Sequence, residues 1–312
     1  MKLHKFFGII TFVLLFVCSI NGMAQDTNTD DGSDPDAPKH NQVKKGFRIG
    51  LYVGAFFANQ YTASIYDGYG FDIDGNKNSF DNSFMNQKIN IQYGGYGYSG
   101  QTDQIAQALN VDYHTWTFDE SDMPTNMRYT PSFLIGLNTI YSVDKKNAIL
   151  MNLNAAKLAI GGNFTITTPA PANSTQINNS IKTFPIVGGE QRLQFEFGYQ
   201  RILGDNEKAN LFVEGGLMAT IAEFSKNVVM INNLTIDLTQ YYNSTLIPNA
   251  LLFKKPIGTG FGVFSGLGVN ITINPKYTIQ LVYNLTYERI NIGLDPMLKF
   301  QNSVGFRAYY NF

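Results

Sequence analysis

The sequence predicts an all-β fold in which about eight antiparallel strands close into a transmembrane up-and-down β-barrel with long outer loops. Two observations predict this fold. Apolar residues alternate with polar residues or glycine in eight segments, and the connections between these segments are alternately short and long. Beyond residue 24 the chain holds no run of about 18 apolar residues, which excludes further membrane-spanning helices.

The predicted strands share a period of two. Successive side chains of a strand point to opposite faces, so this period indicates one apolar face and one mixed face. The segments are 47–55, 133–142, 149–155, 193–199, 211–221, 261–273, 277–287 and 303–312. Strands of roughly 10–14 residues are long enough to cross a membrane at a tilt. The segment 149–155 has the weakest pattern, because Lys157 interrupts its apolar face.

The connections fall into two populations. The short ones are 144–146, 204–207 and 274–275, and the long ones are 58–131, 160–190, 222–258 and 291–299. This alternation is typical of a barrel with short periplasmic turns, long outer loops and both termini in the periplasm. The pattern also permits a ten-stranded variant in which 88–93 joins an extra hairpin.

The N-terminal segment predicts a secreted protein. Lys2 and Lys5 precede an apolar run of about 15 residues, which is too short to favour a spanning helix. Small residues stand at the −3 and −1 positions before Gln25, so we expect a signal peptide over 1–24. The polar, acidic segment 25–45 predicts a disordered periplasmic leader. Cys18 is the only cysteine, and it would leave with the signal peptide.

The end of the chain carries a recognisable pattern. In 303–312 a polar residue and Gly305 precede alternating hydrophobic residues that include Tyr310 and end at Phe312. With the signal peptide and the strands, this run resembles small eight-stranded outer-membrane barrels of the OmpA/OmpX type from Gram-negative bacteria. Gln25 after the cleavage site and the Tyr/Asn-rich loops are similar to barrels of Bacteroidota. The resemblance implies outer-membrane lipid as surroundings, and a last strand read by the barrel assembly machinery through Gly305, Tyr310 and Phe312.

An eight-stranded barrel is just wide enough to be filled by side chains. The alternation places charged residues on its inner face, and buried charges persist only when they are paired. We therefore predict an ionic network that plugs the lumen. Its residues are Arg48, Arg192, Glu196, Glu214 and Arg307. Structural filling of the lumen and an ion-conducting or gated path both remain open.

The first long connection, 58–131, is rich in aromatic residues on a glycine-rich frame. Such a composition suits binding, because aromatic side chains supply contact area at low entropic cost. We identify a candidate partner-binding loop from five residues: Tyr93, Tyr96, Tyr98, Trp116 and Phe118. The same loop could instead form a cap over the barrel mouth. A short helix is expected over 102–109, with Thr102 as its N-cap.

Few residues suggest chemistry. His114, near Asp112, is the only histidine of the predicted barrel, and ordinary loop polarity explains it as well as a rim enzyme does. The run that starts at Asp72 resembles a calcium loop but has Lys77 and Ser83 where glycine and an acidic residue are required. We expect no catalytic residues, metal or cofactor. The net charge of −1 is not the strong positive charge that a nucleic-acid-binding protein uses to contact phosphates.

These observations favour a structural or interaction component of the outer membrane. We expect an accessory subunit of a larger secretion or transport assembly, with a protein partner contacted through the outer loops. The alternative is a narrow channel for ions or small solutes.

Overall fold

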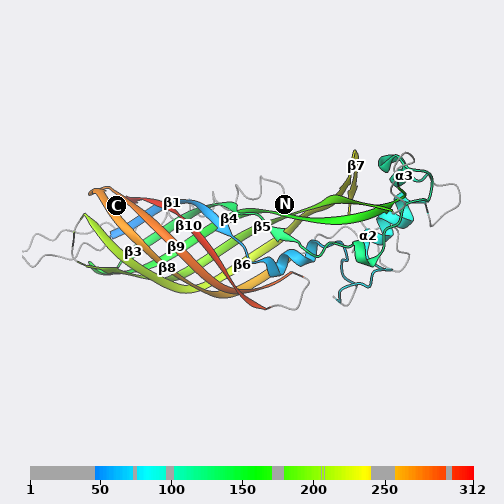
Figure 1. Ribbon diagram of the computed structural model, residues 1–312. Helices are drawn as coiled ribbons and strands as arrows, with labels where there is room; N and C mark the ends of the chain where they lie inside the picture. Colours follow the sequence, from blue (N-terminus) through cyan, green and yellow to red (C-terminus); the bar gives the residue numbers. More distant parts are fainter. Residues whose placement is uncertain are drawn as a thin grey trace, which may run out of the picture. The chain divides into compact units, whose positions relative to one another are not determined.

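The computed structural model describes residues 46–72, 76–95, 102–170, 179–204, 206, 208–239, 257–292 and 297–312. The predicted signal peptide and leader, residues 1–45, lie outside the described residues. Residues 43–312 form one compact unit, which consists of a β-barrel and an outer module (Figure 1).

Eight antiparallel strands form a closed ring, which confirms the predicted barrel. They are β1 (Gly46–Phe57), β3 (Ser132–Ser142), β4 (Asn147–Thr168), β5 (Ser180–Leu203), β6 (Ala209–Ile231), β8 (Ile257–Asn274), β9 (Tyr277–Asn291) and β10 (Leu298–Asn311). The ring closes where β1 pairs with both β10 and β3. Two short strands, β2 (Arg128–Tyr129) and β7 (Leu234–Asp237), pair with β4 and β6 outside the ring.

The ten-stranded alternative is wrong. Residues 88–93, which it required as a strand, lie in the helix η3 (Gln87–Tyr93). The residues that complete the sheet belong instead to β2 and β7, which are two and four residues long. The count of strands around the barrel is therefore eight.

One end of the barrel, here called the turn end, carries the short connections. Asp144 explains one of them, because its Oδ1 accepts hydrogen bonds from the backbone N–H groups of Lys146 and Asn147, both at 2.8 Å. The chain end lies here as well, and the N–H of Phe312 donates to the carbonyl of Phe47 at 3.0 Å. The opposite end is called the loop end.

Strands extend into two of the expected long loops. β4 runs to Thr168 and β5 starts at Ser180, so most of 160–190 is a β-hairpin, and β6 continues to Ile231 within 222–258. The sequence pattern hid these strands because the alternation changes phase along β4: the apolar residues shift from odd to even positions, which we call a phase inversion. In 149–155 of β4 the odd residues are apolar and face outward, whereas beyond Lys157 the buried, apolar residues are even-numbered, such as Ile160 and Phe164.

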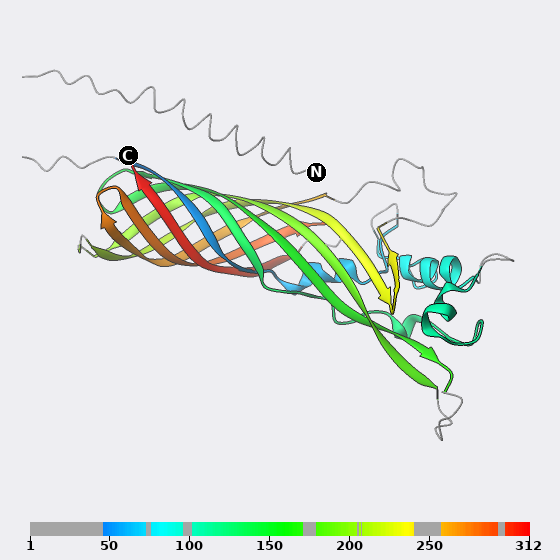
Figure 2. The ribbon, with the colours of Figure 1, turned by 90° about the horizontal axis from the view of Figure 1, so that it is seen from above.

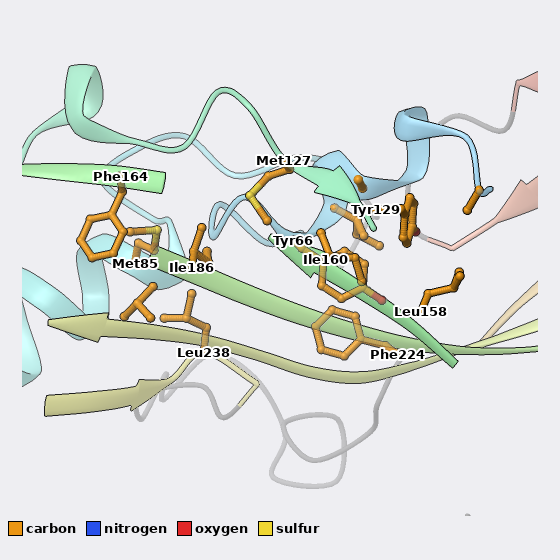
Figure 3. Packing of buried hydrophobic residues seen from close by; sticks show 14 of the residues in the cluster. Tyr66, Met85, Met127, Tyr129, Leu158, Ile160, Phe164, Ile186, Phe224 and Leu238 are labelled. Atoms are coloured by element: carbon orange, nitrogen blue, oxygen red, sulfur yellow. The ribbon is translucent and has the colours of Figure 1, made fainter. Parts of the chain in front are cut away.

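The outer module covers the inner face of these strand extensions (Figure 2). Its helices are η2 (Gln60–Tyr66), α2 (Phe84–Asn86), η3, α3 (Gln104–Leu109) and η4 (Glu120–Asp122). Figure 3 shows Phe164, Ile186 and Leu238 of the strand side together with Met85 of α2 in one hydrophobic cluster. The module is therefore held to the strand extensions by a shared hydrophobic core, and the same cluster continues into the barrel through Tyr52 and Phe212. None of the helices in the described ranges has the length and apolar character that a membrane crossing requires.

Candidate functional site

A continuous apolar band surrounds the barrel. Large hydrophobic side chains point outward from the ring strands, for example Leu51, Leu217 and Phe261, which are 66–68% exposed. Towards the loop end the band stops at polar residues in register on neighbouring strands, where Lys157 pairs with Gln191. Towards the turn end it finishes in aromatic rings; they include Phe47, Tyr277, Tyr310 and Phe312. Apolar outer faces bounded by aromatic and charged residues suit a lipid environment.

The first polar layer of the lumen lies nearer the turn end. Arg307 of β10 donates from Nη1 to Glu214 Oε2 at 2.8 Å and from Nη2 to Glu214 Oε1 at 2.7 Å. The Asn284 amide completes the layer: in the orientation that satisfies both neighbours, it donates to Glu214 and accepts from Arg307, each at 3.2 Å. Gln200 adds a hydrogen bond to Glu214 Oε2 at 3.1 Å. Both charges are almost completely buried and are paired with each other, while Nε of Arg307 has no hydrogen-bond partner among the described residues.

Gly266 of β8 makes this layer possible. A Cβ atom at this position would lie 2.4 Å from Asn284 Oδ1 and 2.6 Å from Glu214 Cγ. Glycine therefore leaves the space through which Glu214 reaches across the inner face of β8 towards β10.

The second polar layer lies at the loop end and centres on Arg192 of β5. Its Nε donates to Glu190 Oε1 and its Nη1 to Gln301 Oε1, both at 2.5 Å. Its Nη2 donates to Thr62 Oγ1 at 3.1 Å and to the Tyr129 hydroxyl at 3.2 Å. Arg192 thus joins the wall of the barrel to the first loop.

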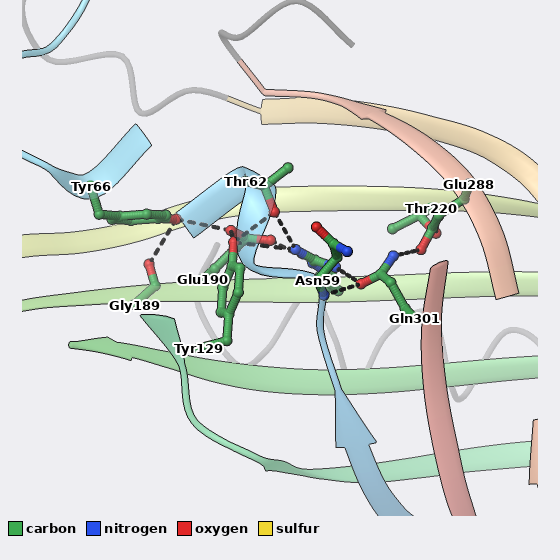
Figure 4. Close-up of polar contacts among 10 residues, drawn as sticks. Asn59, Thr62, Tyr66, Tyr129, Gly189, Glu190, Thr220, Glu288 and Gln301 are labelled. Atoms are coloured by element: carbon green, nitrogen blue, oxygen red, sulfur yellow. Dashed lines mark hydrogen bonds and ion pairs between the residues drawn. The ribbon is translucent and has the colours of Figure 1, made fainter. Parts of the chain in front are cut away.

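Glu190 anchors the outer module to this layer (Figure 4). Its Oε2 accepts from the Tyr129 hydroxyl at 2.6 Å and from the Tyr66 hydroxyl of η2 at 3.2 Å. Burial, reinforced by the Glu190 carboxylate, raises the pKa of Tyr66 and of Tyr129 above the ordinary value, so both hydroxyls remain protonated donors. The Tyr66 ring also stacks on Phe224 at 4.7 Å between centroids. Together these contacts hold η2 in the barrel mouth.

Two further glutamates face the lumen. Glu288 accepts from Thr220 Oγ1 at 2.6 Å and from the Gln301 amide. Glu196 accepts from Asn152 Nδ2 at 2.8 Å. Neither takes part in the ion pairs formed between described residues.

The structure places three of the five residues predicted for the ionic network in these two layers: Arg192, Glu214 and Arg307. Arg307 and Glu214 form one pair, but Arg192 pairs with Glu190, which the sequence reasoning had assigned to the edge of a loop. Arg48 lies at the turn end, with its guanidinium 5.8 Å from the Tyr309 ring centroid and 3.5 Å from Ser142 Oγ.

The aromatic residues of the first loop hold the outer module together. Trp116 is 0% exposed, and its Nε1 donates to Asp103 Oδ2 at 2.9 Å. Phe118 is also buried and contacts Phe164 edge to face, and Tyr93 packs partly buried against the same core. Tyr96 and Tyr98 lie outside the described residues. The described aromatic residues therefore occupy a cap rather than an exposed contact surface.

Asp103 holds two parts of the outer module, here also called the cap: the start of α3 and the Trp116 side chain. It is the N-cap of α3, accepting from the N–H of Ala106 at 2.7 Å, so the helix starts one residue later than the expected cap at Thr102. His114 Nδ1 lies 4.0 Å from the same carboxylate. Asp103 is thus engaged in holding the fold. No group of three or more His, Cys, Asp or Glu residues suited to a metal occurs within the described ranges.

The residues of the proposed assembly signal have structural contacts. Gly305 faces the lumen, where a Cβ would lie 2.4 Å from the Val53 carbonyl and 2.7 Å from the Tyr52 ring. Tyr310 and Phe312 point outward and contact edge to face at 5.0 Å between centroids. Recognition of these residues by the assembly machinery stays a prediction.

No protein-family model matches the sequence, and no curated protein matches it. Solved structures similar to this chain include three bacterial proteins. Ail, the attachment invasion locus protein of Yersinia pestis, in complex with the heparin analogue sucrose octasulfate, has 9% identity and a TM-score of 0.37 over 86% of this chain and 99% of its own. Neisserial surface protein A has 8% identity and a TM-score of 0.37 over 86% and 96%. The outer membrane protein OprG from Pseudomonas aeruginosa has 11% identity and a TM-score of 0.38 over 86% and 97%.

Proposed function

We propose that this chain is an integral outer-membrane β-barrel with a lumen closed by side chains, and that it serves as a structural or interaction component through its loop end. The observation that carries the proposal is the pair of buried ionic layers, Arg307–Glu214 and Arg192–Glu190, beneath a folded cap. A lumen filled in this way leaves the outer module as the part of the protein that meets other molecules. We assign no catalytic role.

The membrane location is supported by the phase inversion along β4. Outward residues are apolar from Ile149 to Ala155, and outward residues from Lys157 onward are charged, small or polar. A strand that passes from lipid into water requires this change of outward surface. With the short turns in the periplasm, both the start of β1 and the end of β10 are periplasmic, and the cap is extracellular.

We further propose that the protein is an accessory subunit of a larger outer-membrane assembly for secretion or transport. A folded module on a closed barrel suits a docking role better than a solute path. The test is purification of the tagged full-length protein from native outer membranes in mild detergent, followed by mass spectrometry. A stoichiometric partner is expected, and recovery of a lone monomer would contradict the subunit role.

A pair of variants sharpens this test. Asp103→Ala removes the carboxylate that holds Trp116 and α3, so it should release a partner bound through the cap while the barrel persists. Asp144→Ala makes the same chemical change in an exposed turn at the opposite end and should retain the partner. Equal recovery of the partner with both variants would exclude the cap as the docking site.

The runner-up function is a narrow channel. Its support is the series of hydrogen-bonded polar groups along the lumen, because conducting barrels also have polar lumen walls. Single-channel recording in planar bilayers separates the two, because a closed barrel gives only rare, small events whereas a channel gives steps of constant size.

A further inference from the structure

One wall of the lumen carries a row of amides beside a carboxylate. Asn138 of β3 is directly opposite Asn152 of β4, and Asn152 is directly opposite Glu196 of β5. Neighbouring strands are about 4.8 Å apart, so the three side chains stand next to one another on the inner face. In the adjacent row Asn154 lies opposite Gln194 and fills the space left by Gly136, where a Cβ would lie 2.0 Å from Asn154 Oδ1.

Several amide atoms in these rows are buried without hydrogen-bond partners, although the Nδ2 of Asn152 donates to Glu196. Asn138 is 0% exposed, and neither its Oδ1 nor its Nδ2 has a partner among the described residues. The same holds for Oδ1 of Asn152 and Oδ1 of Asn154. A buried polar atom without a partner is costly, so such atoms indicate a bound water or ion. Here the unpartnered atoms include three carbonyl oxygens on adjacent strands.

The charge balance of the lumen favours an ion. The described, fully buried lumen charges comprise four glutamates (Glu190, Glu196, Glu214 and Glu288) but only two arginines (Arg192 and Arg307). Each arginine pairs with one glutamate, so Glu196 and Glu288 keep carboxylates without an ion-pair partner. Glu288 accepts hydrogen bonds from Thr220 and Gln301, whereas Glu196 accepts one, from Asn152. A buried charge needs compensation, and the Glu196 carboxylate is in register with Asn152, whose Nδ2 donates to it and whose Oδ1 has no partner.

We propose that Glu196 and the side-chain oxygens of Asn138, Asn152 and Asn154 bind one alkali cation, Na⁺ or K⁺, inside the barrel wall. Carboxylate and amide oxygens are the ligands that hard cations prefer. Glu196 is the one carboxylate in these rows, and a single carboxylate matches a monovalent ion, whereas divalent Ca²⁺ would retain excess positive charge in this buried site. The proposal is independent of the subunit role, since it concerns the isolated barrel.

The experiment compares thermal unfolding of the purified full-length protein in non-ionic detergent at pH 8. NaCl, KCl and N-methylglucamine chloride are used at equal ionic strength, so that only cation identity differs. Wild-type protein should show a saturable stabilisation by Na⁺ or K⁺, with a midpoint that rises by about 3–5 °C for each tenfold excess over the dissociation constant. The large organic cation cannot enter the site and should give no such rise.

Variants assign the effect to the site. Glu196→Gln and Asn138→Leu should abolish or weaken the alkali-specific shift. Glu223→Gln makes the same charge change on the outer surface of β6 and should preserve it. A shift that depends on ionic strength alone, or one that persists in Glu196→Gln, would overturn the proposal.

A second measurement does not depend on a folded variant. The ²³Na resonance of a sample of wild-type protein in micelles should broaden relative to micelles alone, and added K⁺ should reverse the broadening if both ions share the site. Unbroadened signals together with thermal midpoints indifferent to cation identity would mean that water and a protonated Glu196 fill the wall, and the proposal would fail.

Discussion

Arg307 and Glu214 face each other across the lumen and form a two-pronged ion pair, although they are 93 residues apart. They belong to β10 and β6, and strands β9 and β8 lie between these two in the ring. The pair therefore joins walls that backbone hydrogen bonds do not connect directly. Its two nearly equal distances, 2.8 and 2.7 Å, fix the relative positions of both side chains.

Removal of one member of this pair should be strongly destabilising. Arg307→Met leaves the Glu214 carboxylate buried without its guanidinium, and we expect a loss of about 3–5 kcal/mol in the free energy of unfolding. The double variant with Glu214→Met leaves no uncompensated charge and should recover much of this loss. Denaturant unfolding in micelles measures the free energy of unfolding of each variant. Additive losses in the two single variants and the double variant would show that the two residues are not coupled.

Gly266 should tolerate no side chain. Gly266→Ala places a Cβ 2.6 Å from Glu214 Cγ, and we expect a loss of about 1–3 kcal/mol in stability from overpacking. Gly161→Ala on β4 is the matched control, because no atom lies within 4 Å of its added Cβ. Unfolding midpoints of the two variants should therefore differ clearly, and equal midpoints would refute the close approach.

The ring of strands was predictable because lipid and lumen impose opposite demands on alternate residues. Phe195 and Phe197 face outward while Glu196 faces inward, and this contrast is visible in the sequence alone. The extension of β4 beyond Lys157 was not predictable in the same way. There the outward face meets water and the inward face meets the cap, so the apolar phase inverts and the strand looks like a loop.

The polar layers were predictable only in part. The alternation predicted that Arg307 and Glu214 lie on the inner face. Because both are at similar distances from the turn end, they could be expected at the same height in the lumen. The contact of Tyr66 with Glu190 spans 124 residues and depends on how the first loop folds back into the mouth. No local pattern encodes that path, and for the same reason the sequence left open whether Trp116 lies at a contact surface or in a cap.

The stability of the cap should depend on the protonation of Asp67. Burial raises the pKa of this carboxyl above its ordinary value, against the opposing effect of Lys77 at 2.6 Å. A raised folded-state pKa contributes stability that is full below the unfolded pKa and is lost as the pH rises through the folded value. Urea midpoints of the cap should therefore fall over that pH range in wild-type protein relative to Asp67→Asn.

The measurement uses Trp116, the only tryptophan of the chain, whose buried indole reports on the cap. Other carboxyl groups titrate in the same range, so the informative quantity is the difference between wild-type protein and Asp67→Asn at each pH. A difference that is constant from pH 3.5 to pH 7 would contradict the role of Asp67.

The boundary of the apolar band can be located on a single strand. Met151 and Asn163 both point outward from β4, one within the band and one beyond Lys157. Met151→Arg should cost about 2–4 kcal/mol of membrane-inserted stability if it lies near the bilayer midplane. Asn163→Arg should have almost no effect, because its side chain stays in water. Each variant is folded into lipid vesicles, and the folded fraction is measured from the heat-dependent shift of its band on gels. Equal losses for the two variants would place the boundary elsewhere.

The two ionic layers should act as closures in series. Glu190→Ala removes the acceptor of Tyr66 and Tyr129 and the partner of Arg192, so it should loosen η2 at the mouth. Current through the lumen would still be limited by the Arg307–Glu214 layer, because the narrower of two consecutive constrictions sets the conductance. Single-channel recordings of Glu190→Ala should therefore resemble those of wild-type protein, with rare and small events.

Opening should require changes in both layers. A variant that combines Glu190→Ala with Arg307→Ala and Glu214→Ala should show frequent, larger steps, because it lacks the carboxylate at the mouth and both side chains of the inner pair. The inner double variant alone should stay closed, since Arg192 and η2 still fill the mouth. Large, regular steps in wild-type protein, or in either partial variant, would show that one layer does not close the lumen and would favour the channel function.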